Sequence, residues 1–378
     1  MKELKILHIG KYYPPAEGGI EHFLYDLVMW QVKHFPARVG VLVHDHKKGS
    51  RDTLTRSGND HFVYRAGVVG SLAYAPVSPS FPVALARILK SYRPEVLHVH
   101  MPNLSALWVL ALRPQVPLVL HWHSDVVPTP YDRTLRKFYT FYRIFEKRLL
   151  KKAALIIATS PPYLETSPAL RKFRNRCRVI PLGINPARLD ATHGKTGREQ
   201  FFVLSVGRFT YYKGFQYLIE AMQYVNGAFL TIVGDGVLRK EHKKYVEKLG
   251  LVDRVSLPGR ISNRELANML YSCDVFCLPS IERTEAFGLV LLEAMSFSKP
   301  LITTIIEGSG VTWVNQNNVT GVHVPPRDAI ALAGAIQFFR ENPDLAKSYG
   351  ENGKRRFNSM FHISRVACEI WKLYEEVC

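Results

Sequence analysis

Apolar runs of strand length alternate with helix-length segments along this chain. In the first half the runs are Leu4–Ile9, Val39–Val43, Val96–Val99, Leu118–His121 and Leu155–Ala158, with helices expected at Glu21–Phe35, Val83–Tyr92, Leu104–Ala111 and Arg133–Leu150. Wholly apolar strands separated by helices are typical of a mostly parallel sheet covered on both faces. Residues 44–60 are polar, and we expect a loop there.

A second series of the same kind begins at Phe201, after a polar connector. Its apolar runs are Phe201–Val206, Leu230–Val233, Val255–Leu257, Val275–Leu278, Leu301–Thr304 and Gly321–Val324, and a last helix is expected at Ile363–Val377. The sequence therefore predicts an α/β protein of two doubly wound, Rossmann-like domains. Their expected bounds are 1–185 and 201–359, with a linker at 186–200.

Composition excludes several classes of protein. A chain of 378 residues with 47% hydrophobic and 22% charged residues is globular and long enough for two domains. No window of 18 residues is apolar and uncharged, and the first residues form a short strand, so we expect neither a membrane span nor a signal peptide. The five cysteines lack zinc-ligand spacing. Neither a G-x-G-x-x-G fingerprint after a strand nor a P-loop motif occurs.

Two glutamates flank an expected helix start in the second half. Glu285 precedes Phe287-Gly288-Leu289, and Glu293 lies about two turns into the helix. Unpaired N–H groups at a helix start attract phosphate, whereas carboxylates accept hydrogen bonds from hydroxyl groups. Eight residues of helix span roughly 12 Å, further than the about 5–5.5 Å between the carboxyls of a retaining glycoside hydrolase. The pattern favours a ligand with hydroxyls at both ends and an anion between them, such as a nucleotide-sugar; two unrelated glutamates are the alternative.

Two cations follow the first strand of the second half. Arg208 comes directly after Phe201-Phe202-Val203-Leu204-Ser205-Val206-Gly207, and Lys213 lies near the next helix start. Ligands of open α/β sheets bind outside the carboxyl ends of the strands. Two cations there can neutralise a diphosphate without a metal ion. Solvated surface cations are the alternative.

These motifs resemble the retaining glycosyltransferases of family 4 (group 1), which have the GT-B fold. The resemblance rests on Val206-Gly207-Arg208 with Lys213-Gly214, on Glu285-Ala286-Phe287-Gly288 with Glu293-Ala294-Met295, and on Tyr12 to Glu21, and it covers essentially the whole chain. His121-Trp122-His123-Ser124-Asp125 and the stretch from Gly308-Ser309-Gly310 to Gln316 are similar to bacterial α-mannosyltransferases of polysaccharide assembly. The resemblance implies two domains facing a central cleft, with the helix at 360–378 packing on the first domain.

The resemblance also implies roles for individual residues. Catalytic roles fall on His123, Glu285, Arg208 and Lys213. The residues expected to bind the donor are Gly18, Gly19, Arg208, Lys213, Gly234, Arg260, Glu285, Phe287, Gly288, Leu289 and Glu293. In this scheme Glu285 holds sugar hydroxyls, Glu293 the ribose, and backbone N–H groups of Gly308-Ser309-Gly310 lie near the diphosphate. Asp125 either orients His123 or touches the acceptor, His121 and His123 face opposite sides or turn into the loop, and His98 and His100 are structural or line the cleft.

The net charge of +18 is uneven along the chain. Residues 126–180 hold 13 Lys/Arg and 3 Asp/Glu, and the helix expected at Arg133–Leu150 mixes aromatic side chains with cations. This pattern suits a helix on an anionic membrane face. A core helix with a solvated basic face and a nucleic-acid surface are the alternatives. The residues expected to touch the membrane are Arg136, Lys137, Arg143, Lys147, Arg148, Lys151 and Lys152.

The sequence thus predicts a cytoplasmic enzyme that lies on the inner face of the membrane. We expect it to move a hexose, mannose from GDP-mannose, to a lipid-linked or polysaccharide acceptor of a cell-surface glycan, without a metal or other cofactor and without nucleic acid. The same class of enzyme with a UDP-sugar donor is one alternative. A GT-B nucleotide-sugar epimerase and a non-catalytic binding protein are two others.

Overall fold

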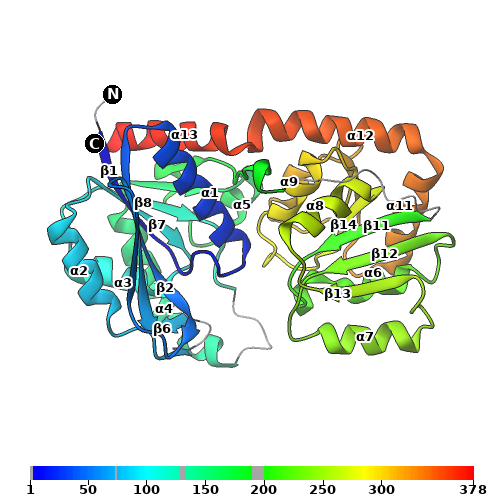
Figure 1. Cartoon of the computed structure of the whole chain (residues 1–378), viewed down its shortest axis with the longest axis horizontal. Helices are drawn as coiled ribbons and strands as arrows, with labels where there is room; N and C mark the ends of the chain where they lie inside the picture. The colour runs from blue at the N-terminus through cyan, green and yellow to red at the C-terminus, as the bar shows by residue number, and fades with distance from the viewer. Residues whose placement is uncertain (1–2, 73–74, 128–132, 190–199) are drawn as a thin grey trace. The chain divides into compact units, whose positions relative to one another are not determined.

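The computed structural model of the chain describes residues 3–72, 75–127, 133–189 and 200–378. Their contacts divide them into two compact units (Figure 1). The first unit comprises Met1–Gly183 with Ile363–Cys378, and the second comprises Ile184–His362. Residues 190–199 of the expected linker lie outside the described residues. Pro186–Arg188, which we also expected in the linker, form the short helix η3 of the second unit.

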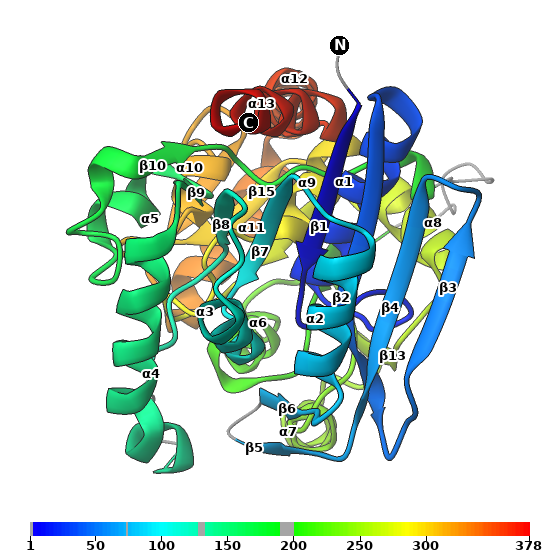
Figure 2. The same cartoon turned by 90° about the vertical axis from the view of Figure 1, so that its left-hand side faces the viewer.

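The first unit is built on an eight-stranded sheet with the order β10-β9-β8-β7-β1-β2-β4-β3 (Figure 2). Every pair in it is parallel except β3 with β4. The chain moves outward from β1 to β2 and β4, then returns to β7 beside β1 and continues to β10 in the other direction. The order therefore reverses between β1 and β7, which is where ligands bind in doubly wound sheets.

The elements of this unit follow the predicted runs closely. The strands are β1 Leu4–Ile9, β2 Ala37–Lys48, β3 Thr53–Ser57, β4 His61–Val68, β7 Val96–Met101, β8 Leu118–Trp122, β9 Leu155–Ala158 and β10 Cys177–Val179, with a small pair β5 Gly70–Leu72 and β6 Ala75–Val77. The helices are α1 Gly19–His34, α2 Phe81–Ser91, η1 Leu104–Ala106, α3 Leu107–Leu112, α4 Arg133–Lys152, α5 Pro161–Thr166, η2 Arg174–Arg176 and α13 Ile363–Val377. Helices α1 and α2 lie on opposite sides of the sheet (Figure 1).

The expectation of a loop at residues 44–60 is wrong. Strand β2 continues to Lys48, and β3 forms the edge of the sheet, antiparallel to β4. All five residues of β3 are exposed. An edge strand with no buried face has no apolar periodicity to detect, so its composition is that of a loop.

The second unit has a six-stranded, wholly parallel sheet with the order β13-β12-β11-β14-β15-β16. Its strands are β11 Phe201–Val206, β12 Ala228–Val233, β13 Val255–Gly259, β14 Val275–Leu278, β15 Leu301–Thr304 and β16 Gly321–Val324. Its helices are η3 Pro186–Arg188, η4 Tyr211–Lys213, α6 Phe215–Ala221, α7 Arg239–Lys248, α8 Asn263–Ser272, α9 Leu289–Ser296, α10 Val311–Val314, α11 Ala329–Glu341, α12 Pro343–Arg356 and the π-helical η5 Phe357–Phe361. Here the order reverses between β11 and β14.

Two glycines within helices of this unit have different surroundings. A Cβ on Gly350 in α12 would lie 1.9 Å from the carbonyl oxygen of Ser298, in the turn after α9, whereas a Cβ on Gly334 in α11 would meet no atom within 4 Å. The close approach of α12 to the end of α9 therefore depends on the missing side chain of Gly350.

We predict opposite effects of alanine at these two glycines. Gly350→Ala should lower the free energy of unfolding by about 1–3 kcal/mol, because the methyl group pushes α12 off the turn. Gly334→Ala should raise it by roughly 0.5–1 kcal/mol, because alanine loses less backbone entropy in a helix. Urea unfolding of both variants beside the wild type measures this. Equal effects of the two substitutions would contradict the proposed contact.

Candidate active site

The carboxyl ends of three neighbouring strands are joined in the second unit. Gly234, just after β12, has φ +130°, and a Cβ there would lie 2.0 Å from the carbonyl oxygen of Gly207. The N–H of Gly234 donates to the carbonyl of Gly259 at the end of β13, at 2.9 Å. Only glycine tolerates this approach and this backbone angle. The turn brings the predicted donor residues Arg208, Gly234 and Arg260 to the same edge of the sheet, and Arg208 and Arg260 are exposed.

Lys213 and Glu285 form a buried ion pair at the point where the strand order reverses. Lys213 ends η4 after β11, and Glu285 lies in the loop after β14. Lys213 Nζ lies 2.5 Å from Glu285 Oε2, which also accepts a hydrogen bond from Ser280 Oγ at 2.9 Å. Lys213 is 7% and Glu285 9% exposed. The structure thus brings together two residues that the sequence analysis predicted separately.

The charge state of Lys213 follows from this pairing. Burial alone would lower its pKa, but attraction to Glu285, the neighbouring Tyr212 and the hydrogen bond to Glu285 together raise it. The positive charge of Arg208 lowers the pKa of Lys213, so Arg208 is close enough to interact electrostatically with the ammonium group. Two cations beside one another can stabilise negative charge as it develops on a departing diphosphate.

The loop Gly308-Ser309-Gly310 has a different role from the predicted one. The N–H groups of Ser309 and Gly310 donate to the carbonyls of Ile306 and Ala286, and Ser309 Oγ donates to the carbonyl of Glu285. The expectation that these two N–H groups face a diphosphate is therefore wrong. Because the sequence shows a glycine-rich loop but not its bonding, it could not reveal that the loop supports Glu285.

Helix α9 begins directly after the Glu285 loop. Gly288, its N-cap, has a left-handed backbone with φ +78°. Phe287 is buried against Trp313 and Phe361, so its side chain belongs to the core and only its backbone is available to a ligand. Leu289 is the first residue of the helix.

Glu293 lies on α9, 6% exposed, and pairs with Arg188 of η3. Arg188 carries no recognisable signal in the sequence, because it lies in the segment predicted to be the linker. Glu285 and Glu293 therefore each have their own cation, in keeping with separate roles. The assignment of Glu293 to a ribose remains a prediction.

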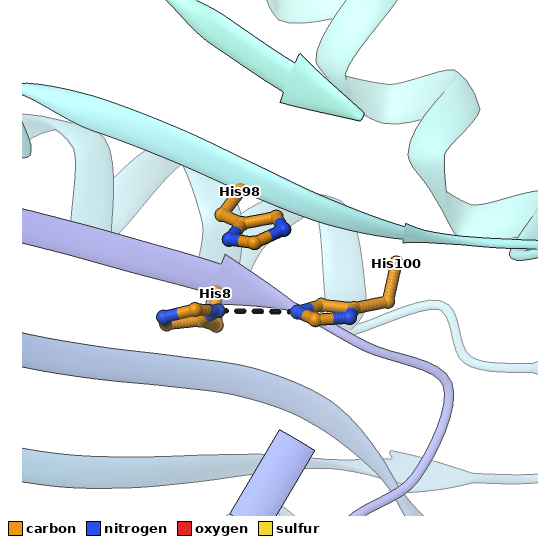
Figure 3. Close-up of side chains that lie close together, drawn as sticks. All are labelled: His8, His98 and His100. Carbon is orange, nitrogen blue, oxygen red and sulfur yellow. Dashed lines mark hydrogen bonds between the residues drawn. The ribbon is translucent and has the colours of Figure 1, made fainter. Parts of the chain in front are cut away.

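In the first unit, the predicted residue His123 belongs to a group of five buried histidines. His8 lies on β1, His98 and His100 on β7, and His121 and His123 at the end of β8; all are at most 3% exposed (Figure 3 shows His8, His98 and His100). We refer to these five side chains as the histidine network. Of the two alternatives expected for His121 and His123, the one in which they face opposite sides is wrong: residues two apart on a strand share a face, and their rings stack at 4.3 Å.

Asp125 and the Gly18–Gly19 turn are placed differently from His123. Asp125 Oδ1 accepts hydrogen bonds from Trp122 Nε1 at 2.9 Å and from Ser167 Oγ at 2.7 Å. His123 Nε2 instead bonds to His100, so Asp125 does not orient His123, and contact with the acceptor is the remaining prediction. Gly18 caps α1 with an extended backbone at φ 168°, which does not itself require glycine.

Helix α4 has one buried and one exposed face. Glu146, Leu149 and Leu150 are buried, and burial raises the pKa of Glu146 to about 7 despite Arg143 at 3.1 Å. The opposite face exposes apolar side chains among cations: Phe138 is 49%, Phe141 79% and Ile144 51% exposed, and the exposed cations are Arg136, Lys137, Lys147, Arg148, Lys151 and Lys152. Arg143 differs from the other predicted membrane residues because it pairs inward with Glu146. Among the helices that the structure describes, none is long and apolar enough to span a bilayer.

Comparisons with known proteins agree with this architecture. Residues 17–188 match the family described as Glycosyltransferase Family 4, and residues 190–356 match Glycosyl transferases group 1. The chain is 30% identical over 379 residues to the O-antigen chain mannosyltransferase C of Escherichia coli, covering 98% of each chain. The structure is similar to sucrose-phosphate synthase from Thermosynechococcus elongatus (TM-score 0.80, 23% identity, 99% and 98% covered) and to Anabaena HepE in complex with UDP-glucose (TM-score 0.74, 19% identity, 99% and 100% covered).

The histidine network predicts a stability that falls in mild acid. Burial lowers the pKa of His8 to about 4 and of His123 to about 3, so below the ordinary value near 6.5 the unfolded chain binds protons that the folded chain does not. Stability from these groups is complete above pH 7 and is lost as the pH falls below 6.5, by about 2 kcal/mol for His8 between pH 7 and 5. Urea unfolding of the wild type at pH 7 and pH 5 measures this loss. The control is His34→Gln, which removes an exposed histidine outside the network and should show the same loss. A free energy of unfolding that is the same at both pH values would contradict it.

Proposed function

Because this chain belongs to the family 4 (group 1) glycosyltransferases and has their GT-B fold, we propose that it transfers mannose from GDP-mannose. The proposed acceptor is lipid-linked or a polysaccharide of a cell-surface glycan. The name of the Escherichia coli relative supports both the sugar and the type of product. The observation that carries the proposal is the buried Lys213–Glu285 pair with Arg208 nearby, at the strand ends where an α/β sheet binds its ligand.

In the proposed reaction, charge develops on the diphosphate as it leaves the sugar. Arg208 and Lys213 stabilise that charge, with help from the N-terminus of α9, so that no metal ion is needed. Glu285 accepts hydrogen bonds from sugar hydroxyls, and its position is fixed by Lys213, Ser280 and Ser309. Glu293 contacts the ribose, and His123 forms a hydrogen bond with the sugar. Leaving-group phosphate then assists deprotonation of the acceptor, with retention at the sugar carbon.

The donor is the part of the proposal that requires a direct test. HepE of Anabaena is known in complex with UDP-glucose, and a UDP-sugar is therefore the second candidate. A thermal-shift screen with GDP-mannose, UDP-glucose and UDP-GlcNAc compares them, because a ligand that binds the folded state raises the melting temperature. At a hundredfold excess over Kd the gain is about 2.7 kcal/mol. We expect GDP-mannose to give the largest shift. A larger shift with a UDP-sugar would overturn the choice of donor.

We predict that Arg208→Ala abolishes most of the activity and leaves the fold intact. Arg208 is exposed, so its loss removes little packing, but removing a preorganised donor to the leaving group costs about 2.7–4 kcal/mol, or 10²–10³ in kcat. Transfer assays with the donor found above measure this. Arg355→Ala, which changes an exposed arginine on α12, is the matched control. Equal turnover in both variants would sink the assignment of Arg208.

We also propose that α4 binds an anionic membrane surface, where a lipid-linked acceptor resides. Exposed Phe138, Phe141 and Ile144 among six exposed cations match an interfacial helix, whose apolar side chains enter the headgroup region while lysines and arginines contact phosphates. A merely solvated basic face would not require exposed phenylalanines. Helix α7 of the second unit is also basic but carries no exposed large hydrophobic side chain.

The comparison of α4 with α7 gives a matched test. Lys147→Glu/Lys151→Glu in α4 and Lys243→Glu/Lys244→Glu in α7 change the net charge equally. We expect the α4 variant to lose roughly tenfold or more in binding to vesicles of phosphatidylglycerol and phosphatidylcholine, since each lysine near the surface is worth about 1 kcal/mol. Phe141→Ser should weaken binding at unchanged charge. Equal losses in the two double variants would show that net charge alone, and not α4, is responsible.

A further inference from the structure

Four of the five histidines of the network lie on three adjacent parallel strands, and His123 follows directly after β8. The register pairs His8 with His98 between β1 and β7, and His100 with His121 between β7 and β8. In Figure 3 the rings of His8, His98 and His100 lie side by side, with His8 joined to His100. The network therefore occupies the point where the strand order of the first unit reverses.

One amide group joins the network into a single chain of hydrogen bonds. Gln31, buried on α1, uses Oε1 with His8 Nε2 at 2.9 Å and Nε2 with the hydroxyl of Tyr374 at 3.4 Å. Tyr374 lies on α13, which follows the second unit in the sequence. Two arms of the chain begin at this amide, one through His8 and one through Tyr374.

The first arm ends at His123. His8 Nδ1 bonds to His100 Nε2 at 3.1 Å, and His100 Nδ1 bonds to His123 Nε2 at 2.9 Å. Burial lowers the pKa of each of these rings, so each is neutral and carries one N–H and one lone pair. The carbonyl oxygen of Gln31 can only accept, so His8 carries its proton on Nε2. It follows that His100 and His123 also carry theirs on Nε2, and that His123 Nδ1 is left as a lone pair.

The second arm ends at His121 with the opposite character. The amide N–H of Gln31 donates to Tyr374, whose hydroxyl then donates to His98 Nδ1 at 2.5 Å. His98 Nε2 donates in turn to His121 Nδ1 at 3.2 Å. His121 Nε2 is left with the proton. Reversing the amide of Gln31 would exchange the roles of the two ends, so its orientation determines which histidine accepts and which donates.

Neither end of the chain has a partner among the described residues. His121 Nε2 and His123 Nδ1 are both buried without a hydrogen bond. Buried polar atoms are normally satisfied, and an orphaned one costs stability. Two such atoms on stacked neighbouring rings indicate a ligand that supplies what they lack.

A metal ion fits this arrangement less well. His8, His98 and His100 lie close enough to share an ion, as do His100, His121 and His123. However, both ring nitrogens of His8, His98 and His100 already take part in the hydrogen bonds of the two arms. A metal ion would have to break several of these bonds, and the network contains no carboxylate to balance its charge.

We propose that Gln31 is a positioning residue that fixes the tautomers of the histidine network, so that His123 Nδ1 accepts a hydrogen bond from a ligand hydroxyl and His121 Nε2 presents an N–H. A sugar hydroxyl is the donor that the glycosyltransferase function supplies to His123, and this part rests on the proposed function. The assignment of the tautomers does not rest on the proposed function. The hydrogen bonds through Tyr374 determine the tautomer of His121 alone, and those through His8 determine the tautomer of His123 alone.

Nitrogen-15 NMR of histidine-labelled protein tests the tautomers directly. Each ring nitrogen shows whether it carries a proton, and loss of signals in His121→Asn and His123→Asn assigns the two ends. In the wild type we expect His123 protonated on Nε2 and His121 on Nε2. Gln31→Met, which keeps the length of the side chain but cannot form hydrogen bonds, should give mixed tautomers at both ends. Tyr374→Phe should give mixed tautomers at His121 and leave the tautomer of His123 unchanged.

Several results would overturn the proposal. The first is a wild-type His123 that is protonated on Nδ1. The second is a Tyr374→Phe variant in which the tautomer of His123 changes as much as that of His121. The third is purified protein that contains one zinc ion per chain and whose histidine nitrogen signals are shifted by the metal. Because the wild-type and Tyr374→Phe spectra decide these points, the test does not depend on whether Gln31→Met folds.

A kinetic measurement separates this proposal from the proposed function. Gln31→Met should lower kcat/KM for the donor about tenfold, the typical effect of one lost hydrogen bond, whereas Tyr374→Phe should leave the contact made by His123 intact. The predicted tautomers without transfer from any donor would refute the transferase function and leave the network standing. Normal transfer with His123 in the wrong tautomer would refute the network alone.

Discussion

Parallel strands place all their carboxyl ends along one edge of a sheet, and the candidate site residues of both units depend on this constraint. Where the strand order reverses, the two loops that follow neighbouring strands diverge and leave room between them. In the second unit Lys213 and Glu285 arrive at this place after β11 and β14. In the first unit His8 on β1 lies opposite His98 on β7, beside the same kind of reversal. Residues far apart in the sequence thereby become neighbours without any specific signal between them.

The two units bury polar groups by different physical means. The second unit buries a charged pair, and the desolvation of Lys213 is offset by Glu285 and its hydrogen bonds. The first unit buries imidazoles that are neutral, because burial and the neighbouring histidines lower the pKa of His98, His100 and His121. A charged pair suits a ligand whose charge changes during a reaction. Neutral rings suit a ligand such as a hydroxyl, which needs one donor or acceptor of fixed direction.

Much of this organisation could be predicted from the sequence, and the failures have physical reasons. Strands buried on both faces were identified because they are apolar throughout, and β14 and β15 begin and end at the predicted residues. The edge strand β3 was missed, since exposure removes that signal. Arg208 and Lys213 were found from their position after a strand. Arg188 and Gln31 could not be identified from the sequence. Arg188 pairs with Glu293 and Gln31 bonds to Tyr374, and each partner lies more than 100 positions away in the chain.

The position of α13 has a consequence for how the protein is made. This helix supplies Tyr374 to the first unit, yet the ribosome synthesises it only after the entire second unit. Domains usually fold in the order in which they emerge, but the earlier unit here lacks part of its interior until α13 has been synthesised. During that interval the face of α1 that receives α13 is uncovered. The first unit can therefore complete its packing only after the residues of the second unit have been made.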